Sequence, residues 1–88
     1  LSQNIPNPFN PETEISYTLP RDSHVKLVIY NVTGQRVKTL VDRFETTGRK
    51  TVRWDGTDES GQKVASGIYF YKLQADEFTQ SKKMVMMK

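Results

Sequence analysis

Three acidic side chains lie close together in one glycine-rich stretch of this 88-residue chain. Asp55, Asp58 and Glu59 share residues 55–61 with Gly56 and Gly61. Oxygen ligands at such short spacing suit calcium, but an EF-hand loop needs acids at alternate positions and a distant bidentate glutamate. Asp-Gly and Ser-Gly pairs are also typical of ordinary turns. We therefore predict no cofactor, and we keep calcium at Asp55, Asp58 and Glu59 as the alternative.

The residue types that perform catalysis are too few to form a recognisable site. His24 is the single histidine and there is no cysteine, so a zinc centre or a histidine-dependent triad lacks its usual partners. Ser66-Gly67 is not part of a G-x-S-x-G elbow. Paired carboxylates that cleave glycosides need a cleft to hold them apart. We predict that the chain is not an enzyme.

Basic residues are spread thinly along the chain. Lysine and arginine number 13 against 10 acids, which gives a net charge of +3. A nucleic-acid-binding surface needs this excess to be clustered, whereas only Lys82-Lys83 breaks an otherwise scattered distribution. No apolar run approaches the ~20 residues of a membrane-spanning helix. We predict neither nucleic-acid binding nor a transmembrane segment.

Lys82-Lys83 also opens a candidate recognition segment at the end of the chain. Lysine on an edge strand commonly protects that edge from unwanted pairing. A terminal strand can instead present its backbone groups to a receptor by strand addition. The candidate recognition segment consists of Lys82, Lys83, Met84, Val85, Met86, Met87 and Lys88.

Apolar and polar residues alternate through most of the chain, which predicts strands with one buried face. The strongest strand runs from Ala65 to Ala75, with Tyr69 and Tyr71 on one face and Phe70 on the other. Between Gln35 and Phe44 the apolar spacing changes from two to three, which predicts a bulge. A chain of this length makes one domain, and two facing sheets are needed to give it a core. The expected core is Ile15, Tyr17, Val25, Leu27, Ile29, Val37, Leu40, Val52, Trp54, Tyr69, Tyr71 and Leu73.

A proline-rich lead-in precedes the first strand. Three of the four prolines lie within residues 6–11, and their spacing favours extended, polyproline-like backbone. Phe9 is the one large apolar side chain of this stretch and is expected to anchor it to the domain. We divide the chain into residues 1–11, a stiff linker, and residues 12–88, a β-sandwich.

Five segments, taken in order, resemble a known family. They are Asn4–Ile15 (NIPNPFNPETEI), Val28–Val37 (VIYNVTGQRV), Trp54–Gly61 (WDGTDESG), Val64–Tyr71 (VASGIYFY) and Lys82–Met84 (KKM). Together they are similar to the C-terminal sorting domain of proteins exported by the type IX secretion system. They are equally similar to the immunoglobulin-like domain related to the flagellar hook-capping protein. The motif residues expected to matter most for the structure are Pro8, Phe9, Trp54, Gly67 and Tyr69.

The resemblance implies an all-β, immunoglobulin-like antiparallel β-sandwich of about seven strands. It implies a non-catalytic module at the C-terminal end of a larger secreted enzyme or adhesin, which it directs through the outer membrane. The expected partners are the secretion translocon, a sorting protease and an N-terminally fused cargo domain, and the module itself is expected to be monomeric. The expected route leads through the periplasm to the outer-membrane surface or the extracellular space.

Two other functions stay open. The chain is alternatively an accessory structural domain, either a spacer or a flagellar-hook-type assembly domain. As a carbohydrate-binding module it would use Trp54, Tyr69, Phe70 and Tyr71 as a stacking platform. Alternating aromatic residues in a strand are, however, also typical of a core between two sheets.

Overall fold

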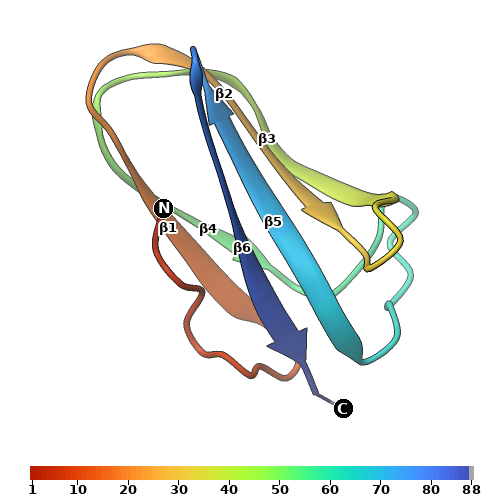
Figure 1. The fold of residues 1–88 in the computed structure, drawn as a ribbon. Coiled ribbons are helices and arrows are strands. Elements are labelled where there is room, and N and C mark those ends of the chain that lie inside the picture. The colour runs from red at the N-terminus through yellow and green to blue at the C-terminus, as the bar shows by residue number, and fades with distance from the viewer. Residues whose placement is uncertain (88) are drawn as a thin grey trace.

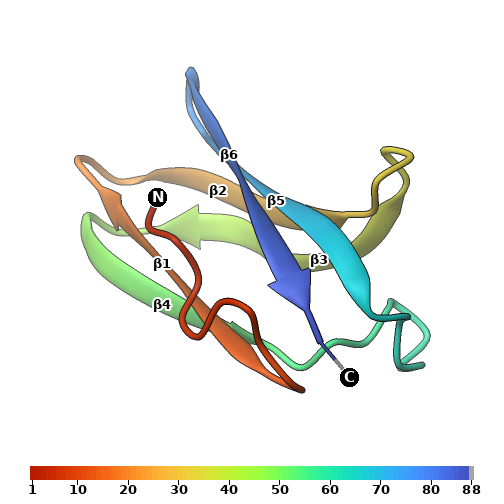
Figure 2. The same cartoon turned by 60° about the horizontal axis from the view of Figure 1, so that its bottom comes forward.

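Six strands pair into two antiparallel sheets that face each other (Figures 1 and 2). The computed structural model describes residues 1–87. The strands are β1 (Thr13–Leu19), β2 (Ser23–Tyr30), β3 (Arg36–Glu45), β4 (Gly48–Trp54), β5 (Gly67–Ala75) and β6 (Phe78–Met86). β1 pairs with β4, and the other four strands lie in the order β3-β2-β5-β6. The predicted all-β sandwich is therefore confirmed.

The described residues hold six strands where about seven were predicted. The segment between β4 and β5, residues 55–66, forms turns and contributes a single isolated bridge between Thr57 and Lys63. Its glycines and acids favour tight turns, and they leave no run long enough to pair as a strand. No helix in residues 1–87 is long and apolar enough to cross a membrane.

Trp54 fills the space between the sheets. Its side chain is 0% exposed, and its ring centroid lies 5.7 Å from that of Phe9 and 5.4 Å from that of Tyr69. The indole N–H donates to the Thr57 carbonyl at 2.9 Å, so the polar end of this buried side chain is satisfied. Trp54 therefore lies in the core, as the sequence predicts.

Nine of the twelve predicted core residues are buried, and the other three are only partly buried. Val37, Leu40 and Val52 are only half-buried and pack against the core from outside. Val37 and Leu40 are the residues that the β2–β3 register skips, so the predicted bulge lies there. Buried apolar residues outside the predicted list are Phe9, Leu19, Val28, Val41, Ala75, Met84 and Met86.

The lead-in bends at residues 6–8 and 10–11 and lies against the sandwich between β1 and β6 (Figure 2). Ile5 forms a bridge with Glu14 on β1, and Phe9 forms a bridge with Met86 on β6. Proline has no N–H to donate, so a continuous ladder cannot form and isolated bridges remain. Phe9 is 1% exposed and anchors the lead-in as expected. The division of the chain at residue 11 stays a prediction.

Replacing Trp54 tests whether this side chain supports the sandwich. We expect Trp54→Ala to lower the free energy of unfolding by about 3–5 kcal/mol, because it leaves a large cavity between the sheets. Urea unfolding followed by circular dichroism measures the loss. The matched control is Phe44→Ala, which removes an aromatic side chain that is 65% exposed and should change stability by less than about 0.5 kcal/mol. Equal losses in the two variants would contradict the assignment.

Candidate functional site at the C-terminal strand

Residues 82–86 of the candidate recognition segment form the second half of β6, at the edge of the four-stranded sheet (Figure 1). Successive side chains of a strand point to opposite faces, so the two lysines separate. Lys82 is half-buried and shares the inner face with Met84 and Met86, which are 0% and 8% exposed. Lys83 is exposed on the outer face. The two lysines therefore do not form one basic surface.

The outer face of β6 continues across to β5. The register places Lys83 beside Phe70 and Val85 beside Ile68. Phe70 and Ile68 are 37% and 42% exposed, and Val85 is half-buried. This outer face thus presents the exposed Lys83 next to a small apolar surface. Of the remaining predicted residues, Met87 is exposed and Lys88 lies outside the described residues.

The lead-in covers the free edge of β6 at its C-terminal end (Figure 2). The backbone N–H of Phe9 donates to the Val85 carbonyl at 3.0 Å, and the Met87 N–H donates to the Phe9 carbonyl at 2.8 Å. The Val85 N–H donates to Asn7 Oδ1 at 2.9 Å. The expectation that this strand presents open backbone groups is therefore wrong for Val85 and Met87, because nearby chain already satisfies them.

Two further residues fix the lead-in, and sequence reasoning missed them. Gln3 Nε2 donates to the Lys83 carbonyl at 2.8 Å. Asn4 is 1% exposed, its N–H donates to Tyr71 Oη at 2.8 Å, and its Nδ2 donates to Thr13 Oγ1 at 3.0 Å. Burial raises the pKa of the Tyr71 hydroxyl. The sequence offered one indication of this contact: Thr13 lies on the same side of its strand as the apolar residues of β1, which predicts an inward side chain.

The five motif residues serve the structure in different ways. Phe9, Trp54 and Tyr69 meet in the core, and the Tyr69 hydroxyl donates to the Ala65 carbonyl at 2.6 Å. Gly67 starts β5 with φ at 143°, a backbone conformation that favours glycine. Pro8 is exposed, next to the anchoring Phe9.

Gly56 is a close-approach position that the sequence analysis assigned only to a turn. Its φ is +78°, and a Cβ built there would collide with the methyl group of Met86 and lie 3.2 Å from the Pro11 carbonyl. A side chain at this position would require the Met86 methyl group to move, and the positive φ independently favours glycine.

The acidic loop is held by hydrogen bonds within its own turns. Asp55 Oδ1 accepts from the N–H and hydroxyl of Thr57, and the hydroxyl is the main reason that the Asp55 pKa is lowered. Asp58 Oδ1 accepts from the N–H groups of Ser60 and Gln62, both at 3.0 Å, and from the Ser60 hydroxyl at 2.7 Å. The Ser60 hydroxyl is the main cause of the lowered Asp58 pKa.

The third acid of this loop, Glu59, points to a different element. Its Oε1 accepts from the Thr39 N–H of β3 at 3.1 Å. Within residues 1–87 no group of three or more acidic or histidine side chains is arranged to hold a metal ion. Asp55 and Asp58 thus act as turn-forming residues, and Glu59 links the loop to β3. That the chain needs no cofactor stays a prediction, with calcium as its alternative.

The structure also gives the surroundings of the single histidine and of the aromatic residues considered for sugar binding. His24 Nε2 lies 2.6 Å from Asp42 Oδ1, and both side chains are exposed. Trp54, Tyr69 and Tyr71 are 0%, 7% and 0% exposed. Phe70 is the one member of the suggested stacking platform at the surface, so these aromatic residues serve the core and form no platform for a sugar.

The fold and the covered edge strand define an immunoglobulin-like β-sandwich module. The chain matches the family model of the FlgD Ig-like domain over residues 3–78 and belongs to that family. No curated protein matches it in sequence. FlgD from Pseudomonas aeruginosa is 26% identical, with a TM-score of 0.67 over 84% of this chain and 58% of that protein. FlgD from Xanthomonas campestris is 22% identical, with a TM-score of 0.68 over 96% and 62%.

The same fold occurs inside much larger proteins. Dimeric latent PorU from Porphyromonas gingivalis is 22% identical, with a TM-score of 0.76 over 97% of this chain and 9% of that protein. PorZ, a surface component of the type IX secretion system of the same organism, is 16% identical, with a TM-score of 0.68 over 98% and 11%. The chain thus spans less than two thirds of each of these four proteins.

Removing the Asn7 side chain tests how firmly the lead-in covers β6. We expect Asn7→Ala to speed hydrogen exchange of the Val85 amide by about tenfold, because that amide loses its acceptor. Nuclear magnetic resonance measures the exchange residue by residue. The control is Asn10→Ala, an exposed asparagine of the same lead-in. Unchanged Val85 exchange in Asn7→Ala, or equal acceleration in both variants, would contradict the contact.

A melting experiment separates the turn and calcium interpretations of the acidic loop. Because Asp55, Asp58 and Glu59 already accept hydrogen bonds, we expect the same melting temperature in excess calcium and in chelator. Differential scanning calorimetry measures both. A ligand present at a hundred times its dissociation constant stabilises by about 2.7 kcal/mol, which is easily detected. A higher melting temperature in calcium that Asp58→Asn abolishes would establish the calcium site.

Proposed function

We propose that this chain is a non-catalytic module of a larger exported protein and that its last strand is recognised by a type IX secretion system. The observation that carries the proposal is the likeness to PorU and PorZ, in which this fold makes up 9% and 11% of a large chain. PorZ is itself a surface component of that system. The partners we propose are the secretion translocon, a sorting protease and the cargo fused ahead of Leu1. The destination is the outer-membrane surface or the extracellular space.

The outer face of β6 is the part of the strand that we propose is recognised. Lys83 is exposed there beside Phe70, and Val85 lies beside Ile68. Met84 and Met86 are buried and act by fixing the strand in the sheet. Since the lead-in occupies the backbone edge at Val85, recognition uses side chains of the outer face and not strand addition at that edge.

The absence of catalysis is part of the same proposal. His24 is paired with an exposed aspartate, and the carboxylates of the acidic loop are engaged in turns. Neither arrangement sets a base beside a nucleophile, which acyl transfer by a triad requires. The module contributes binding and leaves any reaction to the protein that carries it.

A second candidate function rests on the family itself. The chain belongs to the FlgD Ig-like family, and FlgD of X. campestris is described as essential for flagellar assembly through hook capping. As a structural domain of that kind, the chain would act as a spacer or assembly domain, and Lys82 and Lys83 would only protect an edge strand. The export experiment below separates the two functions.

The export experiment fuses residues 1–88 behind a reporter protein in a bacterium with a type IX system. We expect Lys82→Ser/Lys83→Ser to reduce the extracellular reporter by about fivefold or more, the factor that roughly 1 kcal/mol of lost binding produces. Lys83→Ser alone should account for most of the loss, because Lys83 is exposed on the outer face and Lys82 is half-buried. Immunoblots of the medium and the cells measure the distribution.

The matched control is Arg49→Ser/Lys50→Ser on β4. This is also a pair of neighbouring basic residues on an edge strand, with one exposed and one half-buried. Circular dichroism verifies that every variant keeps its fold. Export that is unchanged in the Lys82/Lys83 variant, or equally reduced in the control, would remove the sorting function and leave the structural one.

A further inference from the structure

The free edges of β1 and β6 lie on the same side of the sandwich, with the lead-in between them (Figure 2). We call the space between these two edges the seam. On the β1 side, the Ser2 N–H donates to the Ser16 carbonyl at 2.9 Å, and Ile5 and Glu14 exchange backbone hydrogen bonds at 2.9 and 2.8 Å. On the β6 side, Phe9 pairs with the last residues of the strand. The seam therefore already binds extended chain along two strand edges.

The direction of the lead-in shows where any residues joined ahead of Leu1 would run. Ser2 lies opposite Ser16 and Ile5 lies opposite Glu14, so the lead-in runs antiparallel to β1. Towards the amino terminus it approaches the end of the sandwich that carries the β1–β2 turn. Between these two pairs the lead-in has one residue more than β1. Continued from the Ser2–Ser16 pair, a residue attached to the amino group of Leu1 stands opposite Thr18.

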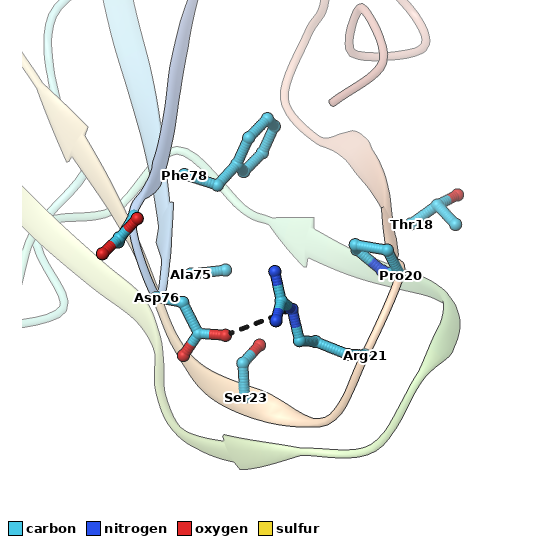
Figure 3. Close-up of a pocket in the computed structure, with 8 residues that line it drawn as sticks. Thr18, Pro20, Arg21, Ser23, Ala75, Asp76 and Phe78 are labelled. Carbon is cyan, nitrogen blue, oxygen red and sulfur yellow. Dashed lines mark ion pairs between the residues drawn. The ribbon is translucent and has the colours of Figure 1, made fainter.

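An unfilled pocket of about 690 Å³ continues the seam at that end (Figure 3). Thr18 and Pro20 line it on the β1 side, and Ala75 and Phe78 line it on the β5–β6 side. Phe78 is 44% exposed, which is unusual for so large an apolar side chain on a strand. The β5–β6 side of the pocket thus presents the partly exposed Phe78 ring as an apolar contact surface.

Backbone groups at the pocket are open as well. In an antiparallel strand, alternate residues direct their N–H and C=O to the same edge. Thr18 therefore faces the seam like Glu14 and Ser16, and Ser81 faces it like Val85. Within residues 1–87, Thr18 and Ser81 have no hydrogen-bond partner on that side. The Arg21–Asp76 ion pair across the mouth spans 3.9 Å between exposed groups, so it is a weak closure that a peptide can displace.

We propose that this open end of the seam binds an extended polypeptide segment, and that its occupant is the segment joined directly to Leu1 in the larger protein. The inference rests on the proposed function in assuming such a fusion, and on the continuity of the pocket with the lead-in contact already present. The residue next to Leu1 pairs with Thr18. The second residue ahead of Leu1 lies on the same face of the extended chain as half-buried Leu1. Its side chain therefore enters the pocket against Phe78. Pro20 ends the pairing because it has no N–H.

This docking fixes the position of the preceding domain. Without it, residues ahead of Leu1 leave the sandwich as a flexible tether. With it, the cargo is held at the end of the sandwich formed by the β1–β2 turn and the β5–β6 hairpin, away from the C-terminal end of β6 that we propose is recognised. Specificity is modest, because backbone pairing accepts many sequences and one apolar side chain selects the register.

The test adds four residues to the amino end of the chain. The first extension is Ser-Ser-Val-Thr, which directs valine into the pocket. The second is Ser-Ser-Thr-Val, which has the same composition and directs valine to solvent. We expect the first extension to slow hydrogen exchange of the Thr18 amide by about tenfold relative to the second. We also expect it to raise the melting temperature by about 4 °C.

Phe78→Ser is the companion variant. It replaces a side chain at the pocket wall that is already partly exposed, and it should abolish the difference between the two extensions. Equal Thr18 exchange in both extended chains would overturn the proposal. Protection that rises with protein concentration would also overturn it, because the occupant would then be a second copy. Both measurements use purified chain without a secretion system, so failure here leaves the export experiment unaffected, and the reverse is also true.

Discussion

Phe9 closes the side of the sandwich that its two sheets leave open. A two-stranded sheet faces a four-stranded one, so β1 and β4 cannot cover the whole inner face of the larger sheet. Trp54 and Tyr69 would face solvent along this side without a further apolar group. Phe9 contacts Trp54, and its backbone bonds to β6 hold it there. Phe9 therefore belongs to the core although it lies in the segment that the sequence predicts to be a linker, and its backbone hydrogen bonds hold the lead-in on the edge of β6.

The alternation of residue types predicted the fold but not the lead-in. Burial along β1 and β5 follows parity residue by residue, so Ile15, Tyr71 and Leu73 could be placed inside from sequence alone. The bond between Asn4 and Tyr71 joins residues 67 positions apart, and no local rule reaches that far. Proline spacing favoured a straight connector. Tertiary hydrogen bonds and the burial of Phe9 bend the same residues onto the sandwich instead.

In the candidate site, too, the sequence predicts features set by neighbouring residues and does not predict contacts between distant ones. The sequence alone predicts that Lys82 and Lys83 lie on opposite faces of the sheet, because successive side chains of a strand point to opposite faces. Which face is covered depends on the opposite sheet, and that required the structure. The acidic loop was ambiguous because the oxygens that form Asx turns are the oxygens that bind calcium. The sequence also offered no sign that Glu59 reaches Thr39 on another strand.

The strength of the lead-in contact bears on how a receptor could bind the last strand. Four hydrogen bonds join lead-in residues to Lys83, Val85 and Met87. At about 0.5–1.5 kcal/mol each, with about 1.5–3 kcal/mol for burying Phe9, they amount to about 4–9 kcal/mol. Small domains have stabilities of about 0.05–0.15 kcal/mol per residue, or roughly 4–13 kcal/mol here. A receptor that added a strand at this edge would have to supply free energy comparable to unfolding the module. A receptor that contacts Lys83 and Val85 on the outer face has no such barrier, so recognition through side chains is the mode that leaves the domain folded.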